Sequence, residues 1–227
     1  MEREKTETSW EARYKNGLVG TQYPLDIVVS FVFTHFPSQK DGPKKRVLDF
    51  GCGVGNHIPF LLERGFDVFA VDSSKTAIRR VKLLMKEEGD QWLDEHVVQN
   101  IEETLPFDDD QFDFVLDRSA LGQNGAAEIP VIVSEIHRVL TPGGVYFGVN
   151  FSDHHPSIQY GKRRGRGDFS DFTGGKFQEI GGRHFFSVSE ILDLFSKFKI
   201  EDIRLMENRS LLGKGSSAEY IVTAIKM

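Results

Sequence analysis

The sequence predicts a doubly wound α/β fold in which a mostly parallel, seven-stranded sheet carries helices on both faces. Two observations lead to this prediction. Short apolar runs alternate along the chain with segments whose apolar residues recur at helical spacing, which is the order of strand and helix in parallel α/β proteins. The runs themselves are continuous rather than alternating, as expected of strands buried on both faces.

Composition excludes several classes of protein. The 227 residues are enough for one domain with a full core. With 28 basic and 34 acidic residues the net charge is -6, which argues against a nucleic-acid binder held by phosphate contacts. The chain has no apolar run of membrane-spanning length and begins with a charged segment, so we expect a cytoplasmic protein without membrane contact. Its single cysteine, Cys52, excludes a disulfide framework and a multi-cysteine metal site, and we expect no metal.

Two helical segments are expected before the first strand. Trp10 and Tyr14 are four residues apart and would share one face of a short helix over about 6–14. These aromatic residues either pin that helix to the body or cover a ligand, and both interpretations stay open. The apolar segment 25–36 follows Pro24 and has helical spacing, although its β-branched residues make a strand the competing interpretation. A polar linker leads from there into the first strand.

A βαβ unit with a glycine-rich turn follows. The turn holds three glycines at alternate positions, Gly51, Gly53 and Gly55. Such a turn lets a ligand approach the backbone closely, although glycines also serve tight turns with no ligand. In open parallel sheets the first turn between strand and helix is the usual ligand site. The expected elements of the unit are a strand over 47–50, a helix over about 58–64 and a strand over 68–71.

The pattern of strand and helix then repeats towards the C-terminus. Ser73 or Ser74 is placed to cap the next helix, and Ser187 with Glu190 forms a capping box that opens the last one. The expected helices cover 74–88, 129–140, where the turn 141–144 stops the helix, and about 187–198. The expected strands cover 96–99, 111–117, 145–151, 200–207 and 218–225, the last two forming an antiparallel hairpin at one edge of the sheet.

Periodicity disappears between residues 152 and 183, where glycines, basic residues and aromatic residues dominate. An irregular segment of this length in a compact domain is more often a functional lid than a failure of assignment. We therefore divide the single domain, 1–227, into an N-terminal helical cover over 1–44, a cofactor-binding core over 45–151, a substrate lid over 152–186, and a C-terminal helix and hairpin over 187–227.

Two acids beside the glycine turn narrow the choice of ligand. Asp72 ends the second strand, where a carboxylate can accept both hydroxyl groups of a ribose, although it could instead cap the helix that follows. Asp49 immediately precedes the turn, where its charge would repel a pyrophosphate but suit an ammonium or sulfonium group. The glycine spacing also departs from that of NAD and FAD sites.

These motifs resemble those of the class I S-adenosylmethionine-dependent methyltransferases, and within them the small-molecule, type 11/25-like group. The segment 47–56 resembles the family's first motif, and Asp72 matches its ribose-binding acid. The segments 105–115 and 136–144 resemble the stretch along the fourth strand and the Pro-Gly-Gly turn before the fifth. The resemblance covers roughly residues 45–150. It implies a Rossmann-like fold and S-adenosylmethionine as cofactor, with S-adenosylhomocysteine as product.

The resemblance also implies roles for individual residues. The glycine turn and Asp49 would hold the methionine part of the cofactor, Asp72 the ribose, and Ser73 would lie beside the adenine. The end of the fourth strand would lie at the methyl-transfer site, although an Asp-Arg pair there could be structural. The cofactor-binding residues expected in this way are Tyr14, Asp49, Gly51, Cys52, Gly53, Gly55, Asp72, Ser73, Asn100, Ile101, Asp117 and Arg118.

The lid is expected to supply the acceptor site. A histidine there could deprotonate a hydroxyl group near neutral pH, and the candidate catalytic residues are His154, His155 and Tyr160. The one basic cluster of this acidic protein also lies in the lid, and it is either a solvated run or a clamp for an anionic acceptor. Aromatic lid residues could cover the acceptor or form the lid's own core. The candidate substrate-binding residues are Ser119, Arg163, Arg164, Arg166, Phe172 and His184.

The sequence thus predicts a methyltransferase that acts on an oxygen or nitrogen of a small-molecule acceptor, such as a sugar or secondary metabolite, as a monomer or homodimer. Two alternatives remain. A cofactor-binding regulatory partner without catalysis would keep the same turn, and an NAD-dependent oxidoreductase is disfavoured by Asp49 and the glycine spacing.

Overall fold

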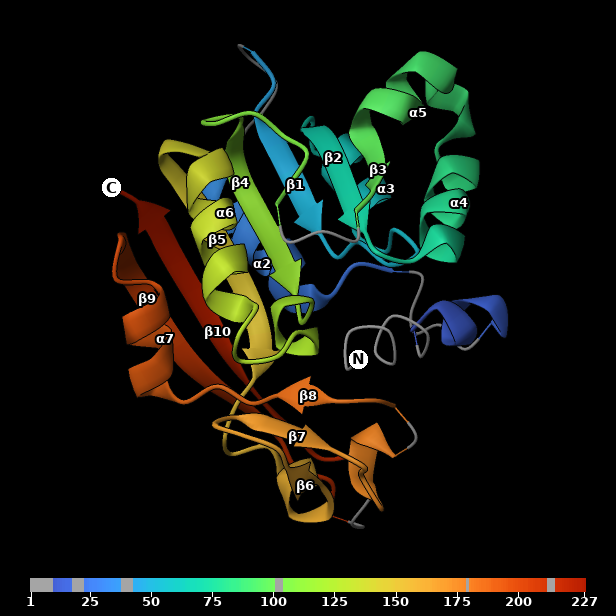
Figure 1. The fold of residues 1–227 in the computed structure, drawn as a ribbon. Helices are drawn as coiled ribbons and strands as arrows, with labels where there is room; N and C mark the ends of the chain where they lie inside the picture. Colours follow the sequence, from blue (N-terminus) through green and yellow to red (C-terminus); the bar gives the residue numbers. More distant parts are fainter. Residues whose placement is uncertain (1–9, 18–22, 38–42, 101–103, 179, 212–214) are drawn as a thin grey trace.

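A seven-stranded sheet in the order β3-β2-β1-β4-β5-β10-β9 organises the molecule (Figure 1). The structure, a computed structural model, describes residues 10–17, 23–37, 43–100, 104–178, 180–211 and 215–227. Strands β1 to β5 pair in parallel, and β10 is antiparallel to both of its neighbours, β5 and β9. The sheet is therefore doubly wound, with its antiparallel pairing at one edge as predicted. The strands are β1 (Arg46–Phe50), β2 (Asp67–Asp72), β3 (Val97–Gln99), β4 (Phe112–Arg118), β5 (Leu140–Phe151), β9 (Phe198–Asn208) and β10 (Ser217–Lys226).

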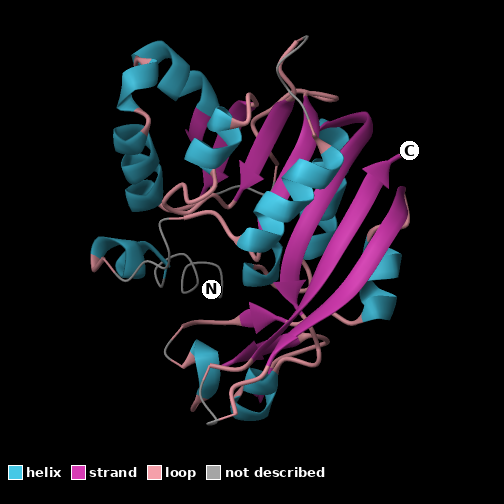
Figure 2. Ribbon diagram, turned by 180° about the vertical axis from the view of Figure 1, so that it is seen from behind, coloured by secondary structure: helices cyan, strands magenta, loops and turns pink. Residues whose placement is uncertain are grey.

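Helices cover both faces of this sheet (Figures 1 and 2). On one face the buried side chains of α2 (Asp26–His35), α3 (Ile58–Glu63) and α4 (Lys75–Leu84) share a core with the sheet. On the other face α6 (Ile129–Val139) and α7 (Val188–Leu194) close a second core. The segment 25–36 is thus a helix rather than a strand, because Val28, Phe31 and Val32 bury one helical face.

A second, three-stranded sheet lies beyond the carboxyl ends of the central strands (Figure 1). It consists of β6 (Lys162–Arg163), β7 (Asp168–Ser170) and β8 (Arg183–His184), and it belongs to the segment that the sequence left irregular. The ends of this segment meet, because Asp153 N donates to Phe186 O at 2.8 Å and Phe186 N donates to Phe151 O at 2.9 Å. The segment therefore leaves and rejoins the body at one place.

Three other boundaries differ from the predicted ones. Helix α4 ends at Leu84, and a helix that the sequence did not indicate, α5 (Asp90–His96), packs only Leu93 and His96 inward. Strand β5 begins at Leu140 instead of after the Pro-Gly-Gly turn. Helix α7 ends at Leu194, not near residue 198, because Phe195 and Phe198 turn into the second core and β9 begins there.

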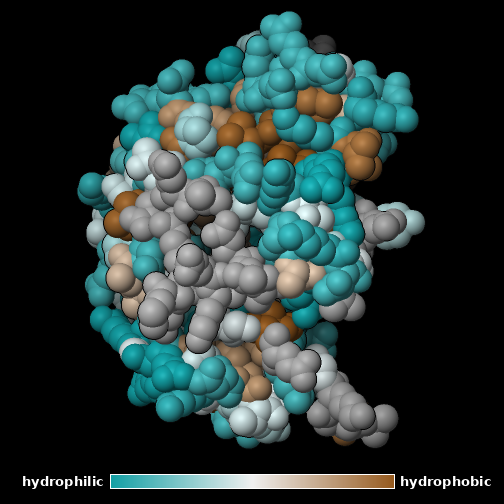
Figure 3. Space-filling view, turned by 45° about the vertical axis from the view of Figure 1, so that its right-hand side comes forward, coloured by the Kyte–Doolittle hydropathy of each residue, from teal (hydrophilic) through white to brown (hydrophobic). Residues whose placement is uncertain are grey.

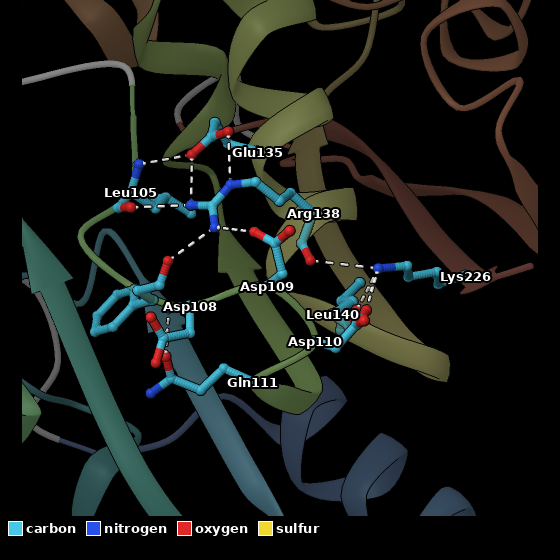
Figure 4. A network of polar contacts seen from close by, with 10 residues as sticks. Leu105, Asp108, Asp109, Asp110, Gln111, Glu135, Arg138, Leu140 and Lys226 are labelled. Carbon is cyan, nitrogen blue, oxygen red and sulfur yellow. Dashed lines mark hydrogen bonds and ion pairs between the residues drawn. The ribbon is translucent and has the colours of Figure 1, made fainter.

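The loop before β4 is fixed by Arg138 of α6 (Figure 4). Its guanidinium donates to the carbonyls of Leu105 and Phe107 at 3.0 and 2.8 Å, and it pairs with Glu135 and Asp109, each at 2.8 Å. These carboxylates hold the pKa of Arg138 above its usual range. Lys226 of β10 donates to Leu140 O at 2.7 Å beside this network. Two of the segments that carry the family resemblance therefore secure the fold.

The face seen in Figure 3 is predominantly hydrophilic. Within the described ranges, no helix combines the length and the apolar composition that crossing a bilayer requires.

Candidate functional site

The glycine turn is compressed between two neighbouring elements. A Cβ on Gly51 would lie 2.2 Å from Ala120 Cβ, just beyond β4, and one on Gly53 would lie 2.8 Å from the Tyr14 hydroxyl. Both residues have positive φ, 69° and 55°, which also favours glycine. Gly51 N and Cys52 N donate to Val71 O of β2 at 2.8 and 3.0 Å. These two hydrogen bonds fix the conformation of the turn at the carboxyl end of β1, where its backbone has no Cβ at Gly51 or Gly53.

Gly55 and Cys52 serve the structure around this turn. A Cβ on Gly55 would lie 3.2 Å from side chains of α3 and α4, so this glycine lets the first helix pack closely. The Cys52 thiol is buried, and burial with the nearby charges of Asp72 and Asp49 raises the pKa of Cys52 well above its usual value. The thiol is therefore protonated and takes no part in acid–base chemistry near neutral pH.

Asp49 is a buried carboxylate that lacks hydrogen bonds. It is 1% exposed, and neither carboxylate oxygen has a hydrogen-bond partner among the described residues. The nearest cationic candidate is His57, whose Nδ1 lies 3.8 Å from Asp49 Oδ2, which is too far for a hydrogen bond. A buried carboxylate without donors is costly unless a ligand supplies them. Asp49 is thus suited to a positively charged donor bound at the glycine turn.

Asp72 braces the turn from the end of β2. Its Oδ2 accepts from Gly53 N and its Oδ1 from Ser74 N, each at 2.8 Å. Burial raises the pKa of Asp72 to about 6, with Asp49 and Glu11 acting in the same direction and the two amide donors acting against them. Ser74, not Ser73, caps α4, since its Oγ accepts from Ala77 N at 3.1 Å. Asp72 therefore binds an amide at the start of the next helix, as the capping interpretation expects, and it also binds an amide of the glycine turn.

The predicted adenine contacts lie beside β3. Asn100 N donates to Asp72 O at 3.1 Å, and Asn100 Nδ2 donates to Thr104 O at 2.9 Å. Ser73 O accepts from Gln99 Nε2 at 3.0 Å. Ile101 lies outside the described residues. Ser73 and Asn100 therefore lie beside Asp72, at the carboxyl ends of β2 and β3.

A short N-terminal helix over residues 10–15 covers the turn, and Glu11 fastens it. The Glu11 carboxylate accepts from Ser74 Oγ at 2.5 Å, Thr76 Oγ1 at 2.7 Å and Thr76 N at 3.1 Å. At the other end of the helix, Arg80 donates to Tyr14 O at 2.5 Å. Burial, together with the charge of Asp72, raises the pKa of the Tyr14 hydroxyl well above its usual range. The sequence did not indicate Glu11, because its partners lie more than sixty residues away.

Trp10 of the same helix reaches the segment that follows β4. Its Nε1 donates to Gln123 Oε1 at 3.1 Å, and the guanidinium groups of Arg13 and Arg183 lie 5.7 and 5.6 Å from its ring. Gln123, Arg13 and Arg183 were not predicted. The sequence feature that pointed to this helix was the spacing of Trp10 and Tyr14. The two side chains do share one helical face, with ring centroids 5.5 Å apart.

Asp117 at the end of β4 points into the core rather than towards the turn. Its carboxylate accepts from Tyr146 Oη, Asn150 Nδ2 and Ala120 N at 2.7–2.8 Å, and from Leu121 N at 3.2 Å. The side chain is fully buried, and burial raises its pKa against these hydrogen bonds. The interpretation of Asp117 as a cofactor ligand is therefore replaced by a structural role.

Arg118 and Ser119 interact with each other at this strand end. Arg118 Nη1 donates to Ser119 Oγ at 2.5 Å, and Ser119 Oγ donates to Val149 O at 2.8 Å. Burial lowers the pKa of Arg118, although Glu219 and Asp117 favour its charge. Ser119 is buried with its hydroxyl occupied, so the expected substrate contact through that hydroxyl is not supported.

The two adjacent lid histidines differ in exposure and in their surroundings. His155 is 1% exposed, accepts from Ser157 N through Nδ1 at 3.1 Å, and packs among the rings of Phe151, Phe177 and Phe185 in tilted and edge-on contacts. Burial, with the nearby charge of Lys176, lowers the pKa of His155 to about 4, so the ring is neutral and a weak base. His154 and Tyr160 are exposed.

His184 joins the lid to α7. Its Nδ1 lies 2.7 Å from Asp168 Oδ1, and its Nε2 lies 3.2 Å from Glu190 Oε2, an ion-pair contact rather than an aligned hydrogen bond. Burial works against the charge, but these two carboxylates raise the pKa of His184. His184 is fully buried between them, so its predicted contact with the acceptor is replaced by a structural role.

The basic cluster and Phe172 also differ from the expectation. Arg163, Arg164 and Arg166 are exposed, and Arg164 is already paired with Asp171. Phe172 is 7% exposed and packs with Phe151, Phe177 and Phe185. Phe172, Phe177 and Phe185 therefore form a small core of the lid, which the sequence left as one of two alternatives, whereas Phe186 packs in the second core of the main sheet.

Comparison with known proteins agrees with this geometry. A sequence model described as a methyltransferase domain matches residues 48–148. An uncharacterized methyltransferase of Synechocystis is 35% identical over 115 residues, which is 51% of this chain and 50% of that protein. The match spans between 36% and 53% of the length of three curated relatives.

Solved structures show the same fold at low identity. The 1,6-didemethyltoxoflavin-N1-methyltransferase of Burkholderia thailandensis, bound to S-adenosylhomocysteine, gives a TM-score of 0.67 at 19% identity and covers 97% of this chain and 87% of its own. The [4+2]-cyclase SpnF gives 0.68 at 16% identity, with 100% and 96% covered. The fold is therefore shared with proteins of more than one activity.

Proposed function

We propose that this chain transfers a methyl group from S-adenosylmethionine to an oxygen or nitrogen atom of a small-molecule acceptor. The premise is that the chain belongs to the class I S-adenosylmethionine-dependent methyltransferases. The single observation that carries the proposal is Asp49. It is a buried carboxylate at the glycine turn whose two oxygens lack donors among the described residues. The ammonium group of a methionine moiety would supply these donors, whereas a pyrophosphate would be repelled.

Other described residues fit the remaining parts of the cofactor. Asp72 lies at the end of β2 with two of its acceptor positions used by amides, and a carboxylate has about four, so it retains capacity for ribose hydroxyls. Tyr14 covers Gly53, which excludes water from the turn. The cofactor, when bound, supplies an activated methyl group on a sulfonium whose departure leaves it neutral.

The chain's own contribution to methyl transfer is mainly alignment. Tyr14 of the N-terminal helix and Ala120 after β4 lie closest to Gly53 and Gly51 of the turn. We propose that these two segments, together with the lid, hold an acceptor in line while excluding water. Of the three predicted lid bases, His155 is buried and neutral, whereas His154 and Tyr160 are exposed. We therefore propose that approach and orientation, rather than strong base catalysis by these residues, govern the rate.

Calorimetry with Asp49→Asn tests the cofactor assignment. Loss of one charge-assisted interaction should weaken S-adenosylhomocysteine binding by about 10- to 100-fold, while NAD should not bind either protein. Asp94→Asn, a change at an exposed carboxylate on α5, is the matched control and should bind as the wild type does. Equal affinity of the Asp49 variant and wild type for S-adenosylhomocysteine would refute the assignment.

Incorporation of labelled methyl groups tests the activity. The enzyme should transfer label from S-adenosylmethionine to compounds in a fractionated metabolite extract, and Asp49→Asn should lower that transfer at limiting cofactor. Binding of S-adenosylhomocysteine without transfer to any fraction would favour the alternative of a regulatory partner that binds cofactor without catalysis.

A further inference from the structure

Arg183 of β8 is a buried cation that has no carboxylate partner among the described residues. Its side chain is 3% exposed, Nη1 donates only to the adjacent carbonyl of Gly182 at 2.5 Å, and Nε has no hydrogen-bond partner. Among the described residues, the charge that acts on the Arg183 guanidinium is that of another cation, Arg13. Two other arginines illustrate the contrast, since Arg138 contacts two carboxylates and Arg164 contacts one. An unpaired buried guanidinium is costly, so a missing anion is the simplest explanation.

Aromatic rings surround this guanidinium on two sides. Arg183 Cζ lies 5.6 Å from the ring of Trp10 and 5.5 Å from the ring of Phe177. Trp10 belongs to the N-terminal helix and Phe177 to the core of the lid. Arg13 lies against the same indole, at 5.7 Å, and its Nε is also buried without a partner. Two guanidinium groups therefore flank one tryptophan where the N-terminal helix meets the lid.

This cluster lies where the N-terminal helix, the segment after β4 and the lid meet, and these are the elements that we propose to hold the acceptor. Trp10 is bonded to Gln123, which follows β4, and Gly122 packs against His184 O beside Arg183. The glycine turn itself is covered by Tyr14. Burial, with the nearby charge of Arg13, lowers the pKa of Arg183 to about 9, so the side chain still carries its charge at neutral pH.

We propose that the acceptor carries a carboxylate group, which Arg183 binds with Arg13 supplying a second positive charge and with Trp10 and Phe177 lying on either side. A guanidinium matches a carboxylate in shape and can bond it through two parallel donors. The proposal rests on the proposed function and names its substrate class. It also transfers the anion-binding role from the exposed cluster of Arg163, Arg164 and Arg166 to Arg183, which is buried, and Arg13, which is half-buried.

Titration with benzoate tests this proposal, because benzoate offers a carboxylate and a flat ring to the aromatic slot. With S-adenosylhomocysteine saturating, wild type should bind benzoate at least 10-fold more tightly than the uncharged benzamide. Arg183→Met keeps the aliphatic stem and should lose this preference, with benzoate bound at least 10-fold more weakly than by wild type. Arg166→Met, a matched change at an exposed lid arginine, should leave it within about twofold. Equal binding of benzoate and benzamide by wild type would overturn the proposal.

A second measurement separates the acceptor's carboxylate from that of the cofactor. Arg183→Met should bind S-adenosylhomocysteine and 5′-methylthioadenosine, which lacks the methionine carboxylate, within about threefold of wild type. Selective loss of S-adenosylhomocysteine binding would assign Arg183 to the cofactor and overturn the proposal. Failure of wild type to bind S-adenosylhomocysteine would instead refute the proposed function.

Thermal unfolding without ligands separates an anion site from a structural role. If Arg183 awaits a ligand, Arg183→Met should melt at or above the wild-type temperature, because an uncompensated buried charge has been removed. A lower melting temperature would overturn the proposal. Glu179, four residues before Arg183, lies outside the described residues, so Glu179→Gln is included. Glu179→Gln should leave benzoate binding and the melting temperature unchanged. If Glu179→Gln and Arg183→Met both lower the melting temperature by the same amount, Glu179 is the partner of Arg183 and the proposal is overturned.

Discussion

Replacing Glu11 by glutamine should loosen the N-terminal helix and weaken cofactor binding. Three donors, from Ser74 and Thr76, reach the Glu11 carboxylate at 2.5–3.1 Å. Burial alone would raise the pKa of Glu11, but these hydrogen bonds outweigh it and lower the pKa from 4.5 to about 2. At 1.36 kcal/mol per pH unit this corresponds to about 3 kcal/mol, which solvent at the 20% exposed side chain reduces to about 2 kcal/mol.

The assay combines calorimetry with tryptophan fluorescence. Two kcal/mol corresponds to about a 30-fold change in the docking equilibrium, so S-adenosylhomocysteine affinity at pH 7 should fall by up to about 30-fold. Trp10 reports on docking in a Trp92→Phe background, since the chain has 2 tryptophans. Glu63→Gln, on an exposed position of α3, serves as the control.

The pH dependence follows from the lowered pKa. Because the docked carboxylate has the lower pKa, its contribution is fully present above about 4.5 and is lost as the pH falls towards 2. The difference between wild type and the glutamine variant should therefore be constant from pH 8 to 5 and shrink below that. Identical fluorescence and affinity of the two proteins at pH 7 would refute the reasoning.

Two further predictions concern stability. Asp117→Ala should destabilise the protein by about 3–5 kcal/mol, because Tyr146 and Asn150 lose a buried charged partner; denaturant unfolding measures this, and a loss under 1 kcal/mol would contradict the structural role. His184→Gln should lower the melting temperature most below pH 6.5, where the raised pKa contributes fully, and the difference from wild type should vanish as the pH rises through the raised value. A difference that grows with pH would show that His184 is buried uncharged.

The sequence predicted the sheet well where a strand or helix buries a continuous run. The strands predicted over 47–50 and 68–71 were found as β1 and β2 with one or two added residues. Helix α5 escaped prediction because only Leu93 and His96 of its residues are buried, too few to produce a periodic signal. The strands of the small sheet are two or three residues long, which is too short for any alternation to be visible.

The site was predictable only where its residues share one local motif. Asp49, the glycine turn and Asp72 lie within one βαβ unit, and the structure brings them together. Arg183 and Trp10 are separated by most of the chain, so their contact depends on how the lid folds back. Asp117 stayed open between a cofactor contact and a structural pair, because strand-end position does not say to which face a side chain points. Its alternation within β4 turns it towards Tyr146.

The meeting of the lid's two ends has a consequence for protein engineering. Because Asp153 and Phe186 are directly bonded across the base of the segment, residues 153–186 form an excursion that closes on itself. A segment of this kind can be exchanged for one from another protein without changing the spacing of β5 and α7. We expect such an exchange to replace Arg183 and Phe177 of the proposed acceptor site while Asp49 and the glycine turn stay in place, so that acceptor preference can be redesigned on a kept cofactor site.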